Sequence, residues 1–121
     1  MTGVQTCALP IYQDGHGLIA TFDGPARAIR CATAISHHAS RLGIQFTAGL
    51  HTGECEVEGS IVGGPAVDTT RKIEKLAGAG RIVVSAVVRD LVAGSGISFQ
   101  PMGALGSENS AELLLLLVEG S

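Results

Sequence analysis

Apolar residues follow two different periods along the chain, and the two periods predict different elements. In Gly17–Phe22 and Ile44–Leu50 apolar side chains recur at alternate positions, the pattern of half-buried β-strands. Two longer segments, beginning near Pro25 and Pro65, repeat apolar residues at spacings of three and four, the pattern of amphipathic helices. Proline suits the first turn of a helix, so both starting points are consistent with helices.

Glycines and short apolar runs predict the remaining elements. Gly43 would end the first helix, and Gly78 and Gly80 the second. The segment "RIVVS" predicts a short buried strand whose Ser85 caps a short helix. This short helix is predicted at 86–93, and two strands follow at 96–103 and 111–120. The predicted apolar stripe of the first long helix consists of Ala28, Ala32, Ile35, Ala39 and Leu42. That of the second long helix consists of Ala66, Thr70, Ile73 and Ala77.

Hairpins mixed with helical crossovers predict an α+β fold. We expect a mostly antiparallel sheet with the helices packed on one face.

Two short stretches carry candidate chemistry. "QDGHG", Gln13–Gly17, predicts a tight hairpin tip that follows a strand within Cys7–Tyr12. The second stretch contains Glu54, Glu56 and Glu58. Residues at every second position share one side of a strand, so these glutamates predict a solvated acidic face or, as the alternative, a metal site.

Composition narrows the possible functions. The 121 residues suffice for one domain, and with 3% aromatics and no Trp its core must consist of Ala, Val, Ile and Leu. A net charge of −3 with scattered basic residues argues against nucleic-acid binding. No apolar run approaches the ~20 residues of a membrane span. Three cysteines without a CxxC spacing indicate reduced thiols in a cytoplasmic protein.

Four segments in unbroken order carry a family resemblance. They are "GHGLIATFDGPARAIRCATAI", "LGIQFTAGLHTGE", "GGPAV" and "GRIVVSAVVRDLVAGSGISF". Together they resemble the class III adenylate/guanylate cyclase catalytic domain, especially bacterial members, including those fused to an α/β-hydrolase domain. The likeness extends from Gly15 to Phe99, and it assigns residues 12–121 to a partial cyclase domain.

The resemblance implies a ferredoxin-like cyclase fold that pairs head-to-tail into a homodimer. It also implies an intracellular signalling reaction in which ATP, or GTP, gives the 3′,5′-cyclic nucleotide and pyrophosphate. Two Mg²⁺ or Mn²⁺ ions held by two aspartates would activate the ribose 3′-hydroxyl and hold the phosphates. An asparagine and an arginine from across the dimer interface would stabilise charge on the α-phosphate.

The family's site residues align with this chain only in part. The second metal aspartate lies at a Gly-Asp-Gly hairpin tip, where a gapless alignment puts His16, between Gly15 and Gly17; with a two-residue insertion, Asp14 takes that place instead. Gly53, after the predicted strand, would let backbone approach backbone or a ligand. The asparagine position holds Asp68, and the arginine position holds Lys72, with Arg71 beside it.

These departures predict that the polypeptide is inactive. A neutral histidine is a poor magnesium ligand, and an aspartate repels phosphates where an amide should donate a hydrogen bond. A lysine lacks the planar fork of arginine, and Arg71 would point about 100° away on the helix. The leader 1–11, "MTGVQTCALPI", does not resemble the family, and we interpret it as a non-native or artefactual segment that replaces the strand with the first metal aspartate.

Two other functional classes stay open at this stage. The first is a degenerate cyclase homology domain that dimerises or binds nucleotide without turnover. The second is a plain interaction module of ferredoxin-like type. An aspartate within an apolar strand upstream of Tyr12 in the parent protein would favour catalysis, whereas failure to bind any nucleoside triphosphate would favour the interaction module.

Overall fold

The structure, a computed structural model, describes residues 2–5, 11–14, 17–21, 24–53, 56–58, 61–78, 80–106 and 113–119, with side-chain burial described from Gly24 onward except at 54–63. Its main feature is a seven-stranded sheet in the order β2-β3-β1-β4-β7-β9-β8. The strands are β1 Thr2–Gln5, β2 Ile11–Asp14, β3 Gly17–Thr21, β4 Ala48–Thr52, β7 Ile82–Ser85, β8 Phe99–Leu105 and β9 Leu113–Val118.

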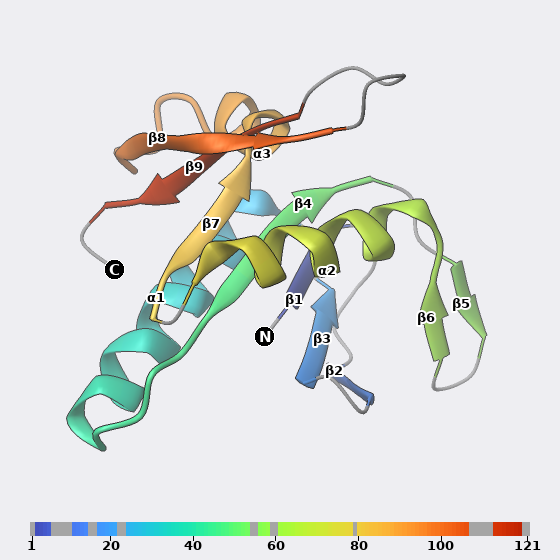
Figure 1. Cartoon of the computed structure of the whole chain (residues 1–121), viewed down its shortest axis with the longest axis horizontal. Helices are drawn as coiled ribbons and strands as arrows, with labels where there is room; N and C mark the ends of the chain where they lie inside the picture. Colours follow the sequence, from blue (N-terminus) through green and yellow to red (C-terminus); the bar gives the residue numbers. More distant parts are fainter. Residues whose placement is uncertain are drawn as a thin grey trace.

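The described helices are α1 Pro25–Arg41, α2 Pro65–Ala77 and α3 Ala86–Leu91. The predicted prolines do stand at the start of α1 and α2, and Ser85 caps α3 by accepting a hydrogen bond from Val88 N. A separate two-stranded ribbon, β5 Glu56–Glu58 and β6 Ile61–Gly63, lies between β4 and α2 in sequence. In Figure 1 this ribbon extends away from the main sheet beside the start of α2.

The predicted α+β class is confirmed, but two details of the prediction are wrong. The sheet is mixed, because β3, β1, β4 and β7 are mutually parallel neighbours while the other neighbouring pairs are antiparallel. The helices also cover both faces: Figure 1 shows α2 in front of the sheet and α1 behind it. Two core clusters reflect this arrangement, one beneath α1 and α3 and one beneath α2.

The two crossovers between parallel strands pass over opposite faces of the sheet. The chain passes from β3 through α1 to β4, and then from β4 through the β5–β6 ribbon and α2 to β7. Both crossovers advance in the same direction across parallel strands, yet on opposite faces, so they have opposite hands. Crossovers are overwhelmingly right-handed, and this preference would have put both helices on one face. The second crossover differs from the first in that it contains the β5–β6 ribbon.

Burial differs from the predicted stripe in α1 and agrees with it in α2. In α1 the buried residues are Ala28, Ile29 and Ala32, and the expected Leu42 is 74% exposed. In α2 the expected Ala66, Thr70, Ile73 and Ala77 are all buried. The first predicted strand after α1 also begins later than expected, since Ile44 to Thr47 are not in a strand and β4 continues through His51 and Thr52.

Thr47 explains why the strand starts late. Its Oγ1 donates to the Gly78 carbonyl at 3.2 Å and accepts from Gly80 N at 3.0 Å. These bonds hold the segment before β4 against the loop that joins α2 to β7, in place of a sheet partner. Outside the strand ladder the backbone of Ala48 donates to Arg81 O at 3.0 Å, which sets the point where β4 joins β7.

Candidate functional site

The predicted hairpin lies at one end of the sheet. Strands β2 and β3 are antiparallel, and Asp14 pairs with Gly17 as the last pair before the turn. Gly15 and His16 lie outside the described residues, so whether His16 or Asp14 takes the aligned position stays a prediction. β1, within the predicted leader, pairs in parallel with β3 and β4.

Two of the three aligned positions on α2 face away from the core. Asp68 and Lys72 are exposed and lie one turn apart, and Arg71 is half-buried. Opposite them, Thr70 is fully buried, and its Oγ1 donates to Ala66 O at 2.6 Å. Asp68 lies in the first turn of α2, where a carboxylate is favoured by the helix dipole. The exposed face of α2 is therefore the part of the predicted site that a second molecule could reach.

Glycines position α2 tightly against β4. A Cβ on Gly49 would lie 2.5 Å from Glu74 N and 3.0 Å from Thr70 O. A Cβ on Gly53 would lie 2.9 Å from the Cβ of Ala66. Real Cβ contacts are not this short, so both positions must lack a side chain for α2 to lie where it does. The close approach of α2 therefore explains why position 53 is a glycine.

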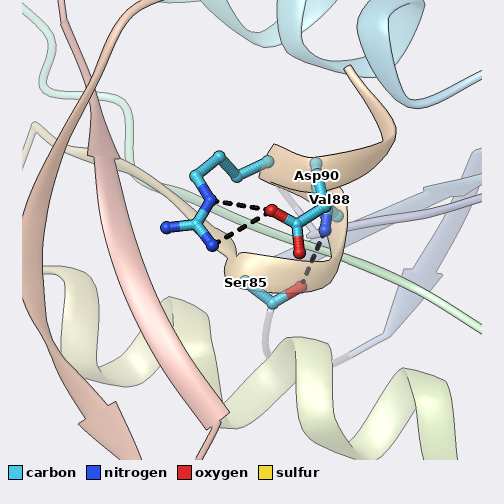
Figure 2. Close-up of polar contacts among 4 residues, drawn as sticks. Ser85, Val88 and Asp90 are labelled. Atoms are coloured by element: carbon cyan, nitrogen blue, oxygen red, sulfur yellow. Dashed lines mark hydrogen bonds and ion pairs between the residues drawn. The ribbon is translucent and has the colours of Figure 1, made fainter. Parts of the chain in front are cut away.

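His51 and Ser85 form a polar pair that the sequence did not predict. His51 Nδ1 lies 2.8 Å from Ser85 Oγ. Ser85 Oγ also accepts from Val88 N at 3.4 Å, and Figure 2 shows this second bond. The neighbouring Arg89 and Asp90 form an exposed ion pair at 3.0 Å, which contributes little to stability. Burial lowers the pKa of His51 from its ordinary value of 6.5, so the imidazole is neutral near neutral pH.

The tautomer of the neutral imidazole decides the direction of the bond. Ser85 Oγ uses one lone pair for Val88 N, and it can then either donate its proton to an unprotonated Nδ1 or accept from a protonated Nδ1 with its second lone pair. This arrangement joins the carboxyl end of β4 to the start of α3. The sequence shows a histidine at the end of a predicted strand and a serine before a predicted helix. Only the register between β4 and β7 shows that these two residues are neighbours.

The described residues do not bring together the ligands of a divalent metal site. Within the described ranges, no group of three or more His, Cys, Asp or Glu residues could hold a metal ion. Asp14 is a suitable oxygen ligand by chemistry, but one carboxylate does not make a site for Mg²⁺. Of the three glutamates considered, Glu54 lies outside the described residues, and Glu56 and Glu58 belong to β5.

The fold is that of adenylate/guanylate cyclase domains. An adenylate/guanylate cyclase/hydrolase from Silicibacter pomeroyi superposes with a TM-score of 0.80 and 24% identity, covering 92% of this chain and 72% of that one. The adenylyl cyclase CyaB from P. aeruginosa gives a TM-score of 0.71 with 17% identity over 93% of this chain and 72% of that one. A guanylate cyclase domain from Catenaria anguillulae, in complex with GTP, gives 0.68 with 17% identity, covering 91% and 71%.

Sequence comparison gives a more limited result. No protein-family model matches the chain. An uncharacterised protein of Mycobacterium tuberculosis is 33% identical over 81 residues, which is 67% of this chain, and a protein of Mycobacterium bovis matches to the same extent. The chain spans only 28% of the length of these curated relatives. In the described part of the chain, no helix has the length and apolar character needed to cross a membrane.

Proposed function

We propose that this chain is part of a bacterial-type class III nucleotide cyclase domain, and that the polypeptide itself is inactive. The parent would convert ATP, or GTP, to the 3′,5′-cyclic nucleotide in the cytoplasm as a step of signal transduction. The observation that carries the proposal is the superposition on the Silicibacter pomeroyi enzyme, with its TM-score of 0.80 over 92% of the chain. One neighbour with GTP and one with ATPαS support a nucleoside triphosphate as the ligand.

The proposed reaction joins two parts of one substrate molecule. The ribose 3′-oxygen forms a bond to the α-phosphorus, the bond to the bridging oxygen of the β-phosphate breaks, and pyrophosphate leaves. The hydroxyl proton must pass to a base or to water. In the parent, Mg²⁺ or Mn²⁺ would supply charge stabilisation for this displacement. Because the described residues of this chain do not fit such ions, we assign them no step.

Asp68 and Lys72 are the residues of this chain closest to the proposed chemistry. Both are exposed on α2, so a second copy in a head-to-tail homodimer could bring its nucleotide against them. Lys72 would offer a cation to the phosphates, whereas Asp68 would repel them and could not donate a hydrogen bond. This pairing supports binding without efficient transition-state stabilisation.

A second candidate is a degenerate cyclase homology domain that dimerises or binds nucleotide without turnover in its parent too. The negative charge of Asp68 on the exposed face of α2 favours it, because truncation of the chain would not explain a substitution within α2. The two candidates differ in what the parent can do. The parent with its upstream segment turns over ATP under the first candidate and does not under the second.

The test uses the purified chain with ATP or GTP and with Mg²⁺ or Mn²⁺. Mass spectrometry measures cyclic nucleotide, titration calorimetry measures nucleotide binding, and sedimentation measures association. We expect background turnover together with measurable binding and a dimer. Turnover well above background would overturn the proposed inactivity. A monomer that binds no nucleoside triphosphate would overturn both candidates and leave a ferredoxin-like interaction module.

A further inference from the structure

A hollow of about 620 Å³ lies on the α1 face of the molecule, on the other side of the sheet from α2. Volumes of this size are typical of small-molecule sites. One wall is α1, and the other is the end of β9 with the segment that precedes β8. The floor is apolar, because Ile29 and Val118 are buried there and Ile97 is half-buried.

The wall formed by α1 carries two basic side chains. Arg30 and His37 are both exposed and lie seven positions apart, which is about 10.5 Å along a helix axis. Between them the wall has only Thr33 and the small Ala34. Thr33 Oγ1 already donates to Ile29 O at 2.9 Å, so it can only accept a further bond. An anion above Ala34 would therefore be within reach of both basic side chains.

The opposite wall carries an acidic side chain. Glu119 is exposed, and its backbone N–H donates to Ser98 O at 2.9 Å, which holds this wall in place. Among the described residues, the side chains of Arg30, His37 and Glu119 make no hydrogen bond or ion pair. Opposite charges thus face an apolar floor from two walls without meeting each other.

We propose that this hollow binds a small zwitterion with an apolar body. Its anionic group would lie between Arg30 and His37, its cationic group would meet Glu119, and its body would cover Ile29, Ile97 and Val118. A ligand with a single charge would complement only one wall. Exposed charges are usually just solvated, but here they flank a concave apolar floor, where a bound molecule removes water from both. The site is separate from the α2 face proposed to meet nucleotide.

The probe is trans-4-(aminomethyl)cyclohexanecarboxylate, which has a carboxylate and an ammonium at opposite ends of an apolar ring. Cyclohexanecarboxylate and cyclohexylmethylamine are the single-charge controls. Backbone amide shifts are followed by NMR on the whole chain, with ligand up to about 10 mM, near the limit of weak binding. We expect saturable shifts at Ile97 and Val118 with the zwitterion, and weaker binding of each control.

Variants separate the two walls. Arg30→Gln and Glu119→Gln each should raise the dissociation constant of the zwitterion about two- to fivefold, as exposed ion pairs do. Arg41→Gln, an exposed change on α1 outside the hollow, should leave it unchanged. No saturable shift, or equal affinity in all variants, would overturn the proposal. Displacement of the zwitterion by ATP would also overturn it, whereas loss of nucleotide binding alone would affect only the proposed cyclase function.

Discussion

His51 Nδ1 lies 2.8 Å from Ser85 Oγ, so one hydrogen bond joins the end of β4 to the residue that caps α3. Ser85 is fully buried and serves two partners at once, the imidazole and Val88 N. His51 is only half-buried, so the residue is partly accessible to solvent. The bond therefore couples a core serine to a side chain that can respond to pH.

Replacing Ser85 by alanine should destabilise the chain by about 1–3 kcal/mol, because a cap is lost and Nδ1 of His51 is left without a partner. Urea unfolding followed by circular dichroism measures the change. Ser98→Ala is the matched control: its side chain is exposed, and the change should stay within about 0.5 kcal/mol. Equal effects of the two substitutions would contradict the role assigned to the Ser85 hydroxyl.

The lowered pKa of His51 predicts a pH dependence with a definite sign. Above the ordinary value of 6.5, the residue is neutral in both folded and unfolded chains and contributes no slope. Below 6.5 the unfolded chain takes up the proton first, so the free energy of unfolding should fall as pH falls, until the folded pKa is passed. Urea unfolding between about pH 7.5 and about pH 5 measures this slope.

His51→Gln provides the reference for that slope. The variant should be less stable at neutral pH, but the part of the pH dependence that belongs to His51 should vanish. His37 and His38 are exposed on α1 and remain in both proteins, so the difference between the two curves isolates the half-buried imidazole of His51. The same slope in both proteins would show that protonation of His51 is not linked to folding.

The sequence predicted the elements better than their arrangement. Prolines 25 and 65 marked both long helices, and the β2–β3 hairpin was expected from its glycines. The second helix face of the sheet was missed, although Ile82, Val83 and Val84 are all apolar and all buried, as in a strand covered on both sides. Local patterns indicate which residues avoid water, but they do not specify the face of the sheet on which a crossover helix packs.

For the candidate site, the sequence predicted the exposure of individual residues but not the contacts between them. Asp68 and Lys72 could be placed on an exposed helix face because the apolar stripe of α2 defines the opposite face. The His51–Ser85 pair could not, because it depends on the parallel register of β4 and β7, which no local pattern encodes. Gly49 was also missed, although a glycine inside a strand is a recognised sign of close backbone approach.

Gly49→Ala should destabilise the chain by about 1–3 kcal/mol, since the added methyl would meet the α2 backbone rather than a movable side chain. Thermal unfolding measures the change. Gly103→Ala in β8 is the matched control, because its Cβ would meet nothing within 4 Å. It should be neutral within about 0.5 kcal/mol. If Gly49→Ala were as well tolerated, α2 would not lie as close to β4 as the structure shows.

Two leucines on the same face of β9 should respond differently to threonine. Leu114 is 52% exposed, whereas Leu116 is 5% exposed in the cluster beneath α1 and α3. Leu116→Thr should cost about 2–4 kcal/mol through a lost apolar contact and a buried hydroxyl. Leu114→Thr should retain the fold and reduce aggregation, because it interrupts the apolar run "LLLLLV" on its exposed side. Light scattering and urea unfolding measure these outcomes, and equal stability losses would place Leu114 in the core.

Asp68→Asn should strengthen ATP binding. The substitution removes one negative charge from the exposed face of α2 and puts a hydrogen-bond donor in its place. We expect the dissociation constant to fall about two- to fivefold at low ionic strength, and the gain to shrink as salt screens the charge. Titration calorimetry at two salt concentrations measures both. Asp90→Asn on α3, on the other side of the sheet and paired with Arg89, should change nothing. An unchanged or weaker affinity in Asp68→Asn, or an equal gain in Asp90→Asn, would show that nucleotide does not approach this face of α2.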